Sequence, residues 1–449
     1  MIERVLKGRV VTASGIVEDG WIAITDGTIV AVGTGDAPEA AEIQDFGSAW
    51  LLPGAVDGQT HAGSQIGFAG MAPTTKAAVI GGVTTIVDMP YDHPIPVTKA
   101  VVLREKIAAI GEHAVCDVAL YGTIPTRPDL SDIRGLIDEG VCAFKISSFE
   151  AHPDRFPRID NSATLVLLKA LEGTCLPLGL HNEDQEIVAH ATKALKEEGK
   201  TGAEYHSQSR PPVAELAATS TFFEVAASTE AHAHIVHISV PEGFEMARAY
   251  RERGVAATAE MCVHYLLFDA QTDMPRLKGL LKVNPPIRPG QTEALWGVLE
   301  QGLCSFVSSD HSAWPLERKT SASIFDVAAG MPGLEAMVPA FFTAAAKRKD
   351  NVQAAMLTAE YLADRPARFF GLSRKGRIAP GFDADIAVLS PEDFVYDATA
   401  NPDGPGWSAY NGMTFTVRPS ATFVRGRKVW DGVAVTDAAG YGRYVPRRS

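Results

Sequence analysis

The stretch "LLPGAVDGQTHAG", residues 51–63, has the pattern of a buried strand that ends in a turn. Two polar side chains, Gln59 and His61, follow its apolar run at a spacing of two positions. Side chains at this spacing point to the same face of a strand. Two histidines so placed would clamp a metal ion, and here a glutamine takes the first position. The stretch is therefore a metal site that has lost a ligand, a modified site that still works, or no metal site.

Seven further apolar segments follow along the chain, with amphipathic helical runs between them. Near-continuous apolar strands are typical of a parallel sheet that is buried on both faces. Eight strand–helix units predict a (β/α)8 TIM barrel, with a doubly wound sheet as the alternative. No GxGxxG follows the first strand, so a dinucleotide site has little support. The eight candidate strands are residues 48–57, 83–90, 114–122, 141–148, 175–183, 232–239, 255–263 and 304–312.

The two chain ends have a different pattern. Residues 1–50 alternate apolar and polar side chains between Gly and Asp-Gly turns, which is typical of β-hairpins. The C-terminal segments "DADIAVLSPEDF" and "TVRPSATFVRGRKVWDG" have the same character. We expect the two ends to pair into one small β domain beside the barrel.

The composition of the chain bears on its partners and on the compartment in which it works. The chain of 449 residues has a formal net charge of −13, 46% hydrophobic and 21% charged residues. This balance is ordinary for a globular protein and argues against nucleic acid or an anionic membrane as the main partner. The five cysteines are scattered without a CxxC pair, which favours reduced thiols and a cytoplasmic protein. We expect no signal peptide and no membrane span, because no apolar run reaches about 20 residues.

Polar side chains stand at the ends of five of the eight predicted strands. The carboxyl ends of TIM-barrel strands meet at one rim, which carries the functional residues. Each side chain alone has an ordinary structural explanation, such as a hydrogen-bonded core histidine or an N-cap aspartate. Imidazole and carboxylate together suit zinc and similar ions, so their joint placement predicts a metal site. The residues are Gln59, His61, Lys145, His181, His237 and Asp310.

Lys145 is the unusual member of this set, because an ammonium group repels a metal ion. A buried lysine has a lowered pKa, and its neutral amine can react. Addition of carbon dioxide to that amine would give a carbamate, an anionic group that can bridge two ions.

Two other histidines, His232 and His234, lie on the sixth strand with His237. They alternate out of phase with His237, so we expect them to face the other side of the strand and pack against helices.

With these motifs in place, the chain resembles the cyclic amidohydrolases, which include allantoinases, dihydropyrimidinases (hydantoinases) and dihydroorotases. The resemblance covers nearly the whole chain and is closest to the allantoinases. It implies a (β/α)8 barrel with C-terminal helices over residues 51–374 and a small β-sandwich domain built from residues 1–50 and 375–449. It rests on "LLPGAVDGQTHAG", "GGVTTIVDMP", "AFKISS", "LHNED", "IVHISVPEG", "KVNPPIR", "VSSDHSAW", "GMPGLE" and "KGRIAPGFDADIAVL".

The resemblance also implies a role for each metal-site residue. Lys145 matches a carbamylated lysine that bridges two ions. One ion would be held by His181 and His237, and the other by His61 and Asp310. Asp310 would in addition act as the proton shuttle.

Substrate-binding residues follow from the same resemblance. Asn284 in "KVNPPIR" and Pro332 in "GMPGLE" match positions where family members bind substrate largely through backbone groups. His93, near the end of the second strand, is a further candidate. Gly63 takes the place of the arginine that grips a carboxylate in dihydroorotases, which argues against dihydroorotate as the substrate.

The implied activity is metal-dependent hydrolysis of a cyclic ureide or amide by a metal-activated hydroxide, with Asp310 moving the proton. Allantoin is the first-choice substrate; a hydantoin, a dihydropyrimidine or another cyclic imide or amide is the alternative. The cofactors would be one or two divalent ions, with zinc preferred and manganese or cobalt as alternatives. A homotetramer or homodimer is implied.

Gln59 departs from the family pattern, which has histidine at this position. Because an amide oxygen is a poorer zinc ligand than imidazole, three interpretations stay open. The site holds two ions with Gln59 as a weak or absent ligand, or one ion on the intact set, or the protein is a non-catalytic scaffold with a degraded metal site.

Overall fold

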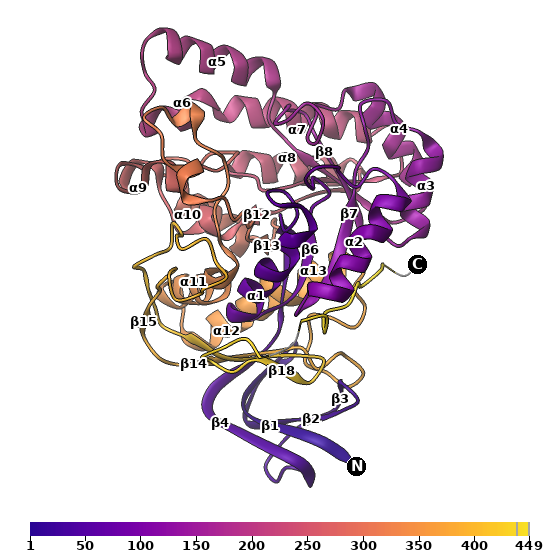
Figure 1. Ribbon diagram of the computed structural model, residues 1–449, viewed down its shortest axis with the longest axis vertical. Helices are drawn as coiled ribbons and strands as arrows, with labels where there is room; N and C mark the ends of the chain where they lie inside the picture. Colours follow the sequence, from indigo (N-terminus) through magenta and orange to yellow (C-terminus); the bar gives the residue numbers. More distant parts are fainter. Residues whose placement is uncertain (437–438, 448–449) are drawn as a thin grey trace.

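A computed structural model describes residues 1–436 and 439–447 and contains two large sheets (Figure 1). The first is a mixed seven-stranded sheet that contains strands from both ends of the chain, at the lower end of the molecule in Figure 1. Only β1 and β4 pair in parallel in it. Its strands, in spatial order, are β18 (Arg427–Trp430), β17 (Arg418–Val424), β14 (Ile386–Ser390), β4 (Ala40–Pro53), β1 (Ile2–Thr12), β2 (Gly15–Thr25) and β3 (Thr28–Thr34). The expected pairing of the two chain ends is therefore present.

The second sheet is parallel and closes into a barrel. Its seventh strand is interrupted at Glu260, so that β11 and β12 are two short pieces of it. Closure comes from a parallel bridge between Thr60 and His311, just beyond the last strand. The strands are β5 (Ala55–Thr60), β6 (Val83–Asp88), β7 (Asp117–Gly122), β8 (Ala143–Ser147), β9 (Pro177–His181), β10 (His232–Ile235), β11 (Ala257–Ala259), β12 (Met261–Cys262) and β13 (Val307–Ser308).

Helices connect successive barrel strands and cover the outside of the barrel (Figure 1). They are α1 (Met71–Ile80), α2 (Ala100–His113), α3 (Leu130–Asp138), α4 (Asn161–Leu171), α5 (Gln185–Glu197), α6 (His206–Ser209), α7 (Pro212–Ala226), α8 (Pro241–Glu252), α9 (Ala270–Leu277) and α10 (Thr292–Glu300). Three more follow β13, namely α11 (Leu334–Arg348), α12 (Asn351–Ala359) and α13 (Arg365–Phe369). Within the described ranges, none of these helices combines the length and apolar character of a membrane span. The order of strands and helices confirms the predicted (β/α)8 barrel.

The first predicted strand, residues 48–57, is wrong as a single element. Residues up to Pro53 belong to β4 of the mixed sheet, and β5 of the barrel begins at Ala55. The chain crosses between the sheets at Gly54, whose N–H donates to the Asp385 carbonyl (2.8 Å). A side chain at Gly54 would collide with Thr84, so the crossing requires glycine.

The prediction that His234 faces away from His237 is also wrong. The His234 ring stacks on Phe306 inside the barrel, with ring centroids 5.6 Å apart. Strand β10 ends at Ile235, and His237 has a left-handed backbone (φ +43°), so the alternation of faces stops between them. Phe369 of α13 packs against both His234 and Phe306 and closes this end of the barrel. The carboxyl ends of the strands lie at the opposite end.

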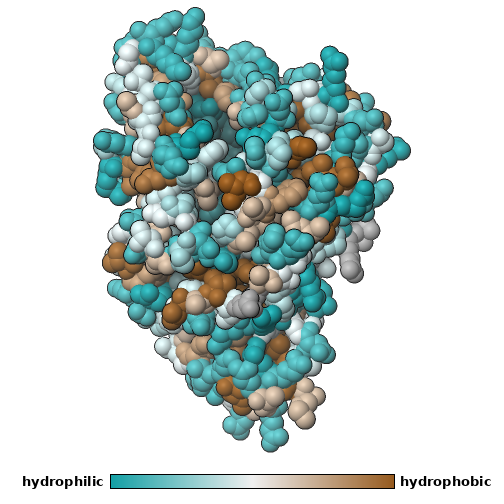
Figure 2. All heavy atoms as spheres, in the orientation of Figure 1, coloured by the Kyte–Doolittle hydropathy of each residue, from teal (hydrophilic) through white to brown (hydrophobic). Residues whose placement is uncertain are grey.

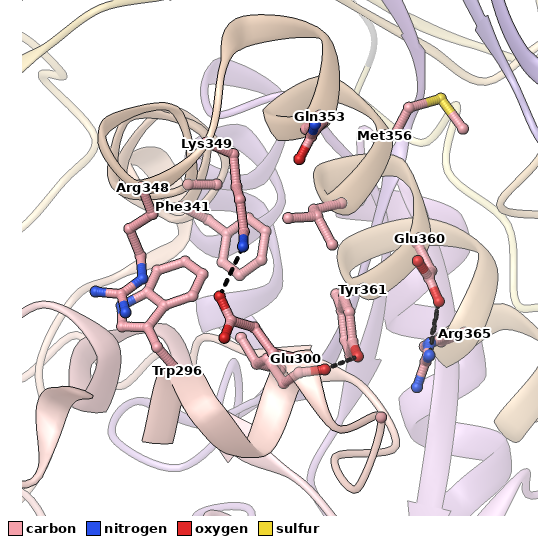
Figure 3. A pocket seen from close by; sticks show the side chains of 14 residues that line it. Trp296, Glu300, Phe341, Arg348, Lys349, Gln353, Met356, Glu360, Tyr361 and Arg365 are labelled. Atoms are coloured by element: carbon pink, nitrogen blue, oxygen red, sulfur yellow. Dashed lines mark hydrogen bonds and ion pairs between the residues drawn. The ribbon is translucent and has the colours of Figure 1, made fainter. Parts of the chain in front are cut away.

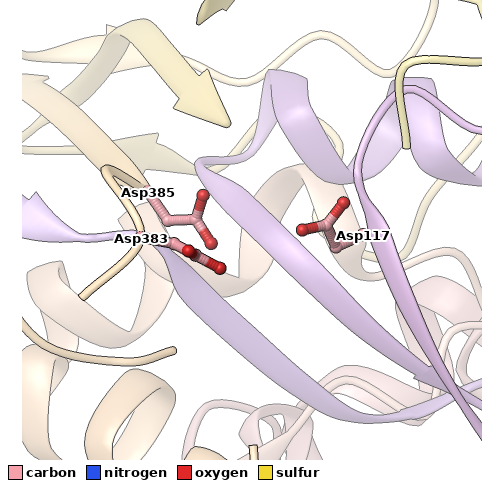
Figure 4. A group of neighbouring side chains, drawn as sticks. All are labelled: Asp117, Asp383 and Asp385. Atoms are coloured by element: carbon pink, nitrogen blue, oxygen red, sulfur yellow. The ribbon is translucent and has the colours of Figure 1, made fainter. Parts of the chain in front are cut away.

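A buried ion cluster joins the barrel to the mixed sheet. Asp117 begins β7, while Asp383 and Asp385 precede β14 (Figure 4). Lys375 Nζ lies 2.5 Å from Asp117, 2.9 Å from Asp383 and 2.7 Å from Asp385. Arg425 also pairs with Asp117. The three carboxylates could collect a cation, but protein cations already pair with them, so this cluster is structural.

We predict that Lys375→Met destabilises the fold strongly, because it leaves the buried carboxylates of Asp117 and Asp385 short of a cation. Loss of one partner of a buried pair costs about 3–5 kcal/mol. Lys349→Met, which breaks a half-exposed pair with Glu300, is the matched control and should have a much smaller effect. Urea and thermal unfolding of both variants measure the difference. Equal unfolding midpoints would contradict the structural role of the cluster.

Candidate active site

A cavity of about 550 Å³ opens at the carboxyl ends of the barrel strands. Six residues expected at the site line it together, and Gln59 is buried beside Lys145 and hydrogen-bonded to it. The strand order explains this meeting, because parallel strands place their carboxyl ends at one rim. The six residues are His61, Lys145, His181, His237, Asn284 and Asp310.

His181 and His237 face each other across the cavity floor. His181 Nδ1 lies 3.1 Å from His237 Nε2. Two ligands of one tetrahedral zinc ion, each at 2.0–2.1 Å, are separated by about 3.3 Å. The other nitrogen of His181, Nε2, lies 2.8 Å from Glu183, and Glu183 also pairs with Arg210. Burial acts to raise the pKa of Glu183, but Arg210 and His181 outweigh it and hold the pKa at about 2. A carboxylate behind a ligating histidine orients its ring.

His61 and Asp310 form a second pair of donors. His61 Nε2 lies 3.4 Å from Asp310 Oδ1, and His61 Nδ1 is held by Ser64 Oγ at 3.0 Å. Burial acts to raise the pKa of Asp310, yet the neighbouring His61 lowers it below its ordinary value. Asp310 has a left-handed backbone (φ +48°), as His237 does. Such conformations cost about 1–3 kcal/mol and cluster at functional sites.

Lys145, Gln59 and Glu260 form a buried chain beneath the two pairs. Lys145 Nζ donates to Gln59 Oε1 (3.1 Å), and Gln59 Nε2 donates to Glu260 Oε1. Burial lowers the pKa of Lys145 below its ordinary value, although Asp310 and Glu260 act to raise it. Glu260 also accepts from the His237 backbone N–H (2.7 Å) and from Ser308 Oγ (2.8 Å). Glu260 thus fixes both Gln59 and the backbone that carries His237.

The donors at the cavity fit divalent metal ions. Asp310 Oδ1 and His237 Nδ1 are buried without a hydrogen-bond partner among the described residues. An unpaired buried oxygen or nitrogen costs about 1–3 kcal/mol, so its retention needs an explanation. Both imidazole–imidazole and imidazole–carboxylate pairs have the donor types and separations that one ion would need. The amine of Lys145 is compatible with carbamylation, since its hydrogen-bond partner among the described residues is the amide oxygen of Gln59.

The expected substrate-binding residues divide into two groups. Asn284 lines the cavity, and its Oδ1 is buried without a partner in the described part of the chain. Pro332 is buried outside the cavity lining, and its carbonyl accepts from Ser408 Oγ (2.9 Å). His93 is exposed on the loop after β6, also outside the lining. The structure therefore does not bring Pro332 and His93 together with the other candidates.

Two functional positions were missed by the sequence reasoning. Glu183 and Glu260 are fully buried beside the candidate metal-site residues. The signal for them was a carboxylate within or directly after an apolar strand, in "GLHNE" and "ATAEMCV". A buried carboxylate must be paired or protonated, so it marks a polar network.

Another pocket of about 510 Å³ lies between α10, α11 and α12 (Figure 3). Four of its five charged side chains pair with each other, Lys349 with Glu300 and Arg365 with Glu360, and the fifth, Arg348, pairs with Glu293 outside the lining. Tyr361 donates to the Leu299 carbonyl (2.7 Å). Among the described residues, this pocket therefore carries no set of convergent free donors comparable to the barrel cavity.

Comparisons with known proteins agree with this geometry. The allantoinase of Rubrobacter xylanophilus is 32% identical over 458 residues, covering 99% of this chain and 98% of that protein. The allantoinase of Streptomyces avermitilis is 31% identical over 449 residues, covering 98% of each. The D-hydantoinase of Ralstonia pickettii is 30% identical, covering 98% of each.

Solved structures share the whole fold. The L-hydantoinase (dihydropyrimidinase) from Arthrobacter aurescens superposes with a TM-score of 0.93 at 26% identity, covering all of both chains. A D-hydantoinase structure gives a TM-score of 0.89 at 28% identity, covering 100% of this chain and 99% of the other. The sequence profile described as the amidohydrolase family matches residues 50–429. The chain belongs to the amidohydrolase family.

Proposed function

We propose that the protein is a metal-dependent hydrolase that opens the amide bond of a cyclic ureide or amide. The observation that carries the proposal is the meeting of two donor pairs, His181–His237 and His61–Asp310, in one cavity. The relatives named allantoinase and hydantoinase support cyclic amides as the substrate class. Allantoin is the first candidate, with hydantoins and dihydropyrimidines as alternatives.

The metal would be held by these two pairs, with a carbamylated Lys145 between them. Nitrogen and oxygen donors of this kind favour zinc, and manganese or cobalt are alternatives. A bound divalent ion supplies a more acidic water and polarises the substrate carbonyl. Whether one or two ions bind depends on Gln59, whose Oε1 is already engaged by Lys145.

Asp310 would move the proton. Its carboxyl is ionised at neutral pH, because the pKa lies below the ordinary value beside His61. A carboxylate at the cavity floor can take a proton from the attacking water and return it to the leaving ring nitrogen. Asn284, with a free amide oxygen at the cavity wall, would bind an N–H of the ring.

Assembly and location are proposed as well. We propose a homotetramer or homodimer in the cytoplasm. Five unpaired cysteines, four of them buried, support a reducing compartment.

The metal proposal predicts bound zinc, manganese or cobalt in the purified protein, at one or more ions per chain. His237→Ala should lower the metal content, because it removes one donor of the closer pair. His190→Ala, on the exposed face of α5, is the control. Mass spectrometry of the metals after dialysis provides the measurement. Equal metal content in both variants would argue against the proposed ligands.

The activity proposal predicts ring opening of allantoin, hydantoin or dihydrouracil by the metal-loaded protein. Asp310→Asn should lower kcat by about 100- to 10,000-fold, because the amide cannot accept the proton. Asp154→Asn, on an exposed loop position, should retain the wild-type rate. Detection of the ring-opened acid by liquid chromatography measures the rates. Full activity in Asp310→Asn would refute the proton-shuttle role.

The glutamine position yields a separate prediction. Gln59→His places a better zinc ligand beside Lys145 and should raise the number of ions bound per chain. Metal titration by isothermal calorimetry compares the variant with the wild type. An unchanged stoichiometry would mean that position 59 is not a ligand position in this protein.

A further inference from the structure

Basic side chains outnumber carboxylates in the lining of the barrel cavity, although the protein as a whole is acidic. The chain has a net charge of −13, and Figure 2 shows hydrophilic side chains over most of the visible face. A cleft whose charge opposes that of the whole protein concentrates ligands of the opposite sign. The cavity lining contains five basic side chains against two carboxylates: Lys145, Arg155, Arg210, Lys282 and Arg318 against Glu150 and Asp310.

Three of the five basic groups already have partners. Arg210 pairs with the buried Glu183. Lys282 Nζ donates to the carbonyls of Ile324 (2.6 Å) and Val327 (2.5 Å), and burial lowers its pKa to about 7. Lys145 belongs to the metal site. These three groups are therefore not free to bind an anion.

Arg155 and Arg318 make no ion pair with any residue in the described part of the chain. Arg318 is exposed at the rim and lies over the Trp314 ring, 5.4 Å from its centroid. Arg155 is only partly exposed and is fixed in place, since its Nη1 donates to the Ser64 carbonyl (2.8 Å). Of the two, Arg155 is the pre-positioned cation.

The position of Arg155 connects it to the metal site on two sides. Ser64, to which it donates, also holds His61 Nδ1 at 3.0 Å. The next residue, Phe156, stacks on Tyr91 at 3.8 Å and meets the His181 ring edge-on at 5.8 Å. The guanidinium is therefore held beside the reacting centre.

The surrounding charges leave the guanidinium available. Asp92 interacts electrostatically with Arg155, but it is buried and paired with Lys106 at 2.7 Å, while Glu150 of the cavity lining makes no ion pair with Arg155 among the described residues. Position 63 cannot supply a cation in its place, because a side chain there would collide with Asp92. The absence of an arginine at position 63 thus does not exclude an acidic substrate, since Arg155 reaches the adjacent residue from the loop after β8.

We propose that Arg155 makes the cavity selective for cyclic amides or ureides that carry a carboxylate substituent. The guanidinium has a planar fork of N–H donors that matches a carboxylate, and only its Nη1 is engaged. The substituent would lie toward Ser64 and Phe156, while the scissile amide lies over the metal donors. This inference rests on the proposed function and names the substrate class for it.

The experiment compares hydantoin-5-acetic acid with its primary amide, two rings of nearly equal size that differ in charge. The zinc-loaded wild-type protein should favour the acid by about 10- to 100-fold in kcat/KM, mainly through KM. Arg155→Gln should reduce this preference at least tenfold. Arg155→Lys should restore part of it, because lysine keeps the charge but lacks the fork.

Arg158→Gln is the matched control, since Arg158 lies on the same loop, outside the cavity lining, and pairs with Glu186. It should keep the wild-type preference, and circular dichroism checks that each variant is folded. Equal rates for acid and amide in the wild type would overturn the proposal. A preference for the acid that survives in Arg155→Gln would also overturn the proposal. The same holds for a preference that disappears only in Arg318→Gln.

Failure of the proposed function can be distinguished from failure of the role proposed for Arg155. If neither ring is hydrolysed, calorimetry gives the Kd of both compounds for the zinc-loaded protein. Tighter binding of the acid that is lost in Arg155→Gln would support the role of Arg155 without catalysis. Equal Kd values for acid and amide would overturn it.

Discussion

The site depends on the seam that closes the barrel between its last and first strands. Asp57 in β5 accepts hydrogen bonds from the N–H and the hydroxyl of Ser309, both at 2.7 Å. The His61 N–H donates to the His311 carbonyl at 2.9 Å. Burial raises the pKa of Asp57 to about 6 even against the hydrogen bonds it accepts. This seam fixes the register that places Asp310 beside His61, and a slip of one residue would turn these side chains to opposite faces.

The polar groups at the strand ends form two layers. In one layer every group has hydrogen-bond partners, and in the other some buried atoms have none. Both carboxylate oxygens of Glu260 accept hydrogen bonds, from Gln59, Ser308 and the His237 backbone. Asp310 Oδ1, which lies 3.4 Å from His61 Nε2, and His237 Nδ1 are buried without a hydrogen-bond partner among the described residues. Because an unpaired buried polar atom destabilises a fold, such atoms are kept where a ligand completes them. The layer with complete hydrogen bonds thus supports the site, and the layer with unpartnered atoms is where we expect the chemistry.

The strand ends were predictable because they depend on local pattern alone. Apolar runs gave the barrel strands, and their order gave the meeting of His61, His181, His237 and Asp310 at one rim. The features that could not be predicted depend on contacts between residues that are far apart in the sequence. The split of residues 48–57 between two sheets depends on how the chain ends pair, and His234 faces inward because β10 stops at Ile235. The partners of Glu260 lie on β5, on β13 and just after the end of β10, so no local spacing indicates them.

Gln59 is a neutral residue that makes hydrogen bonds at a position where a metal ligand is expected. A side-chain amide donates and accepts at once, whereas a carboxylate only accepts and an ammonium only donates. Gln59 accepts from Lys145 at Oε1 and donates to Glu260 from Nε2. It therefore links these two buried groups, each of which would otherwise have fewer hydrogen-bond partners. Since both ends of the amide are engaged, neither is directed at the His61–Asp310 pair. The position therefore stabilises the floor of the site, and under the proposed function the His61–Asp310 pair would hold an ion with fewer side-chain ligands than a histidine at position 59 would give.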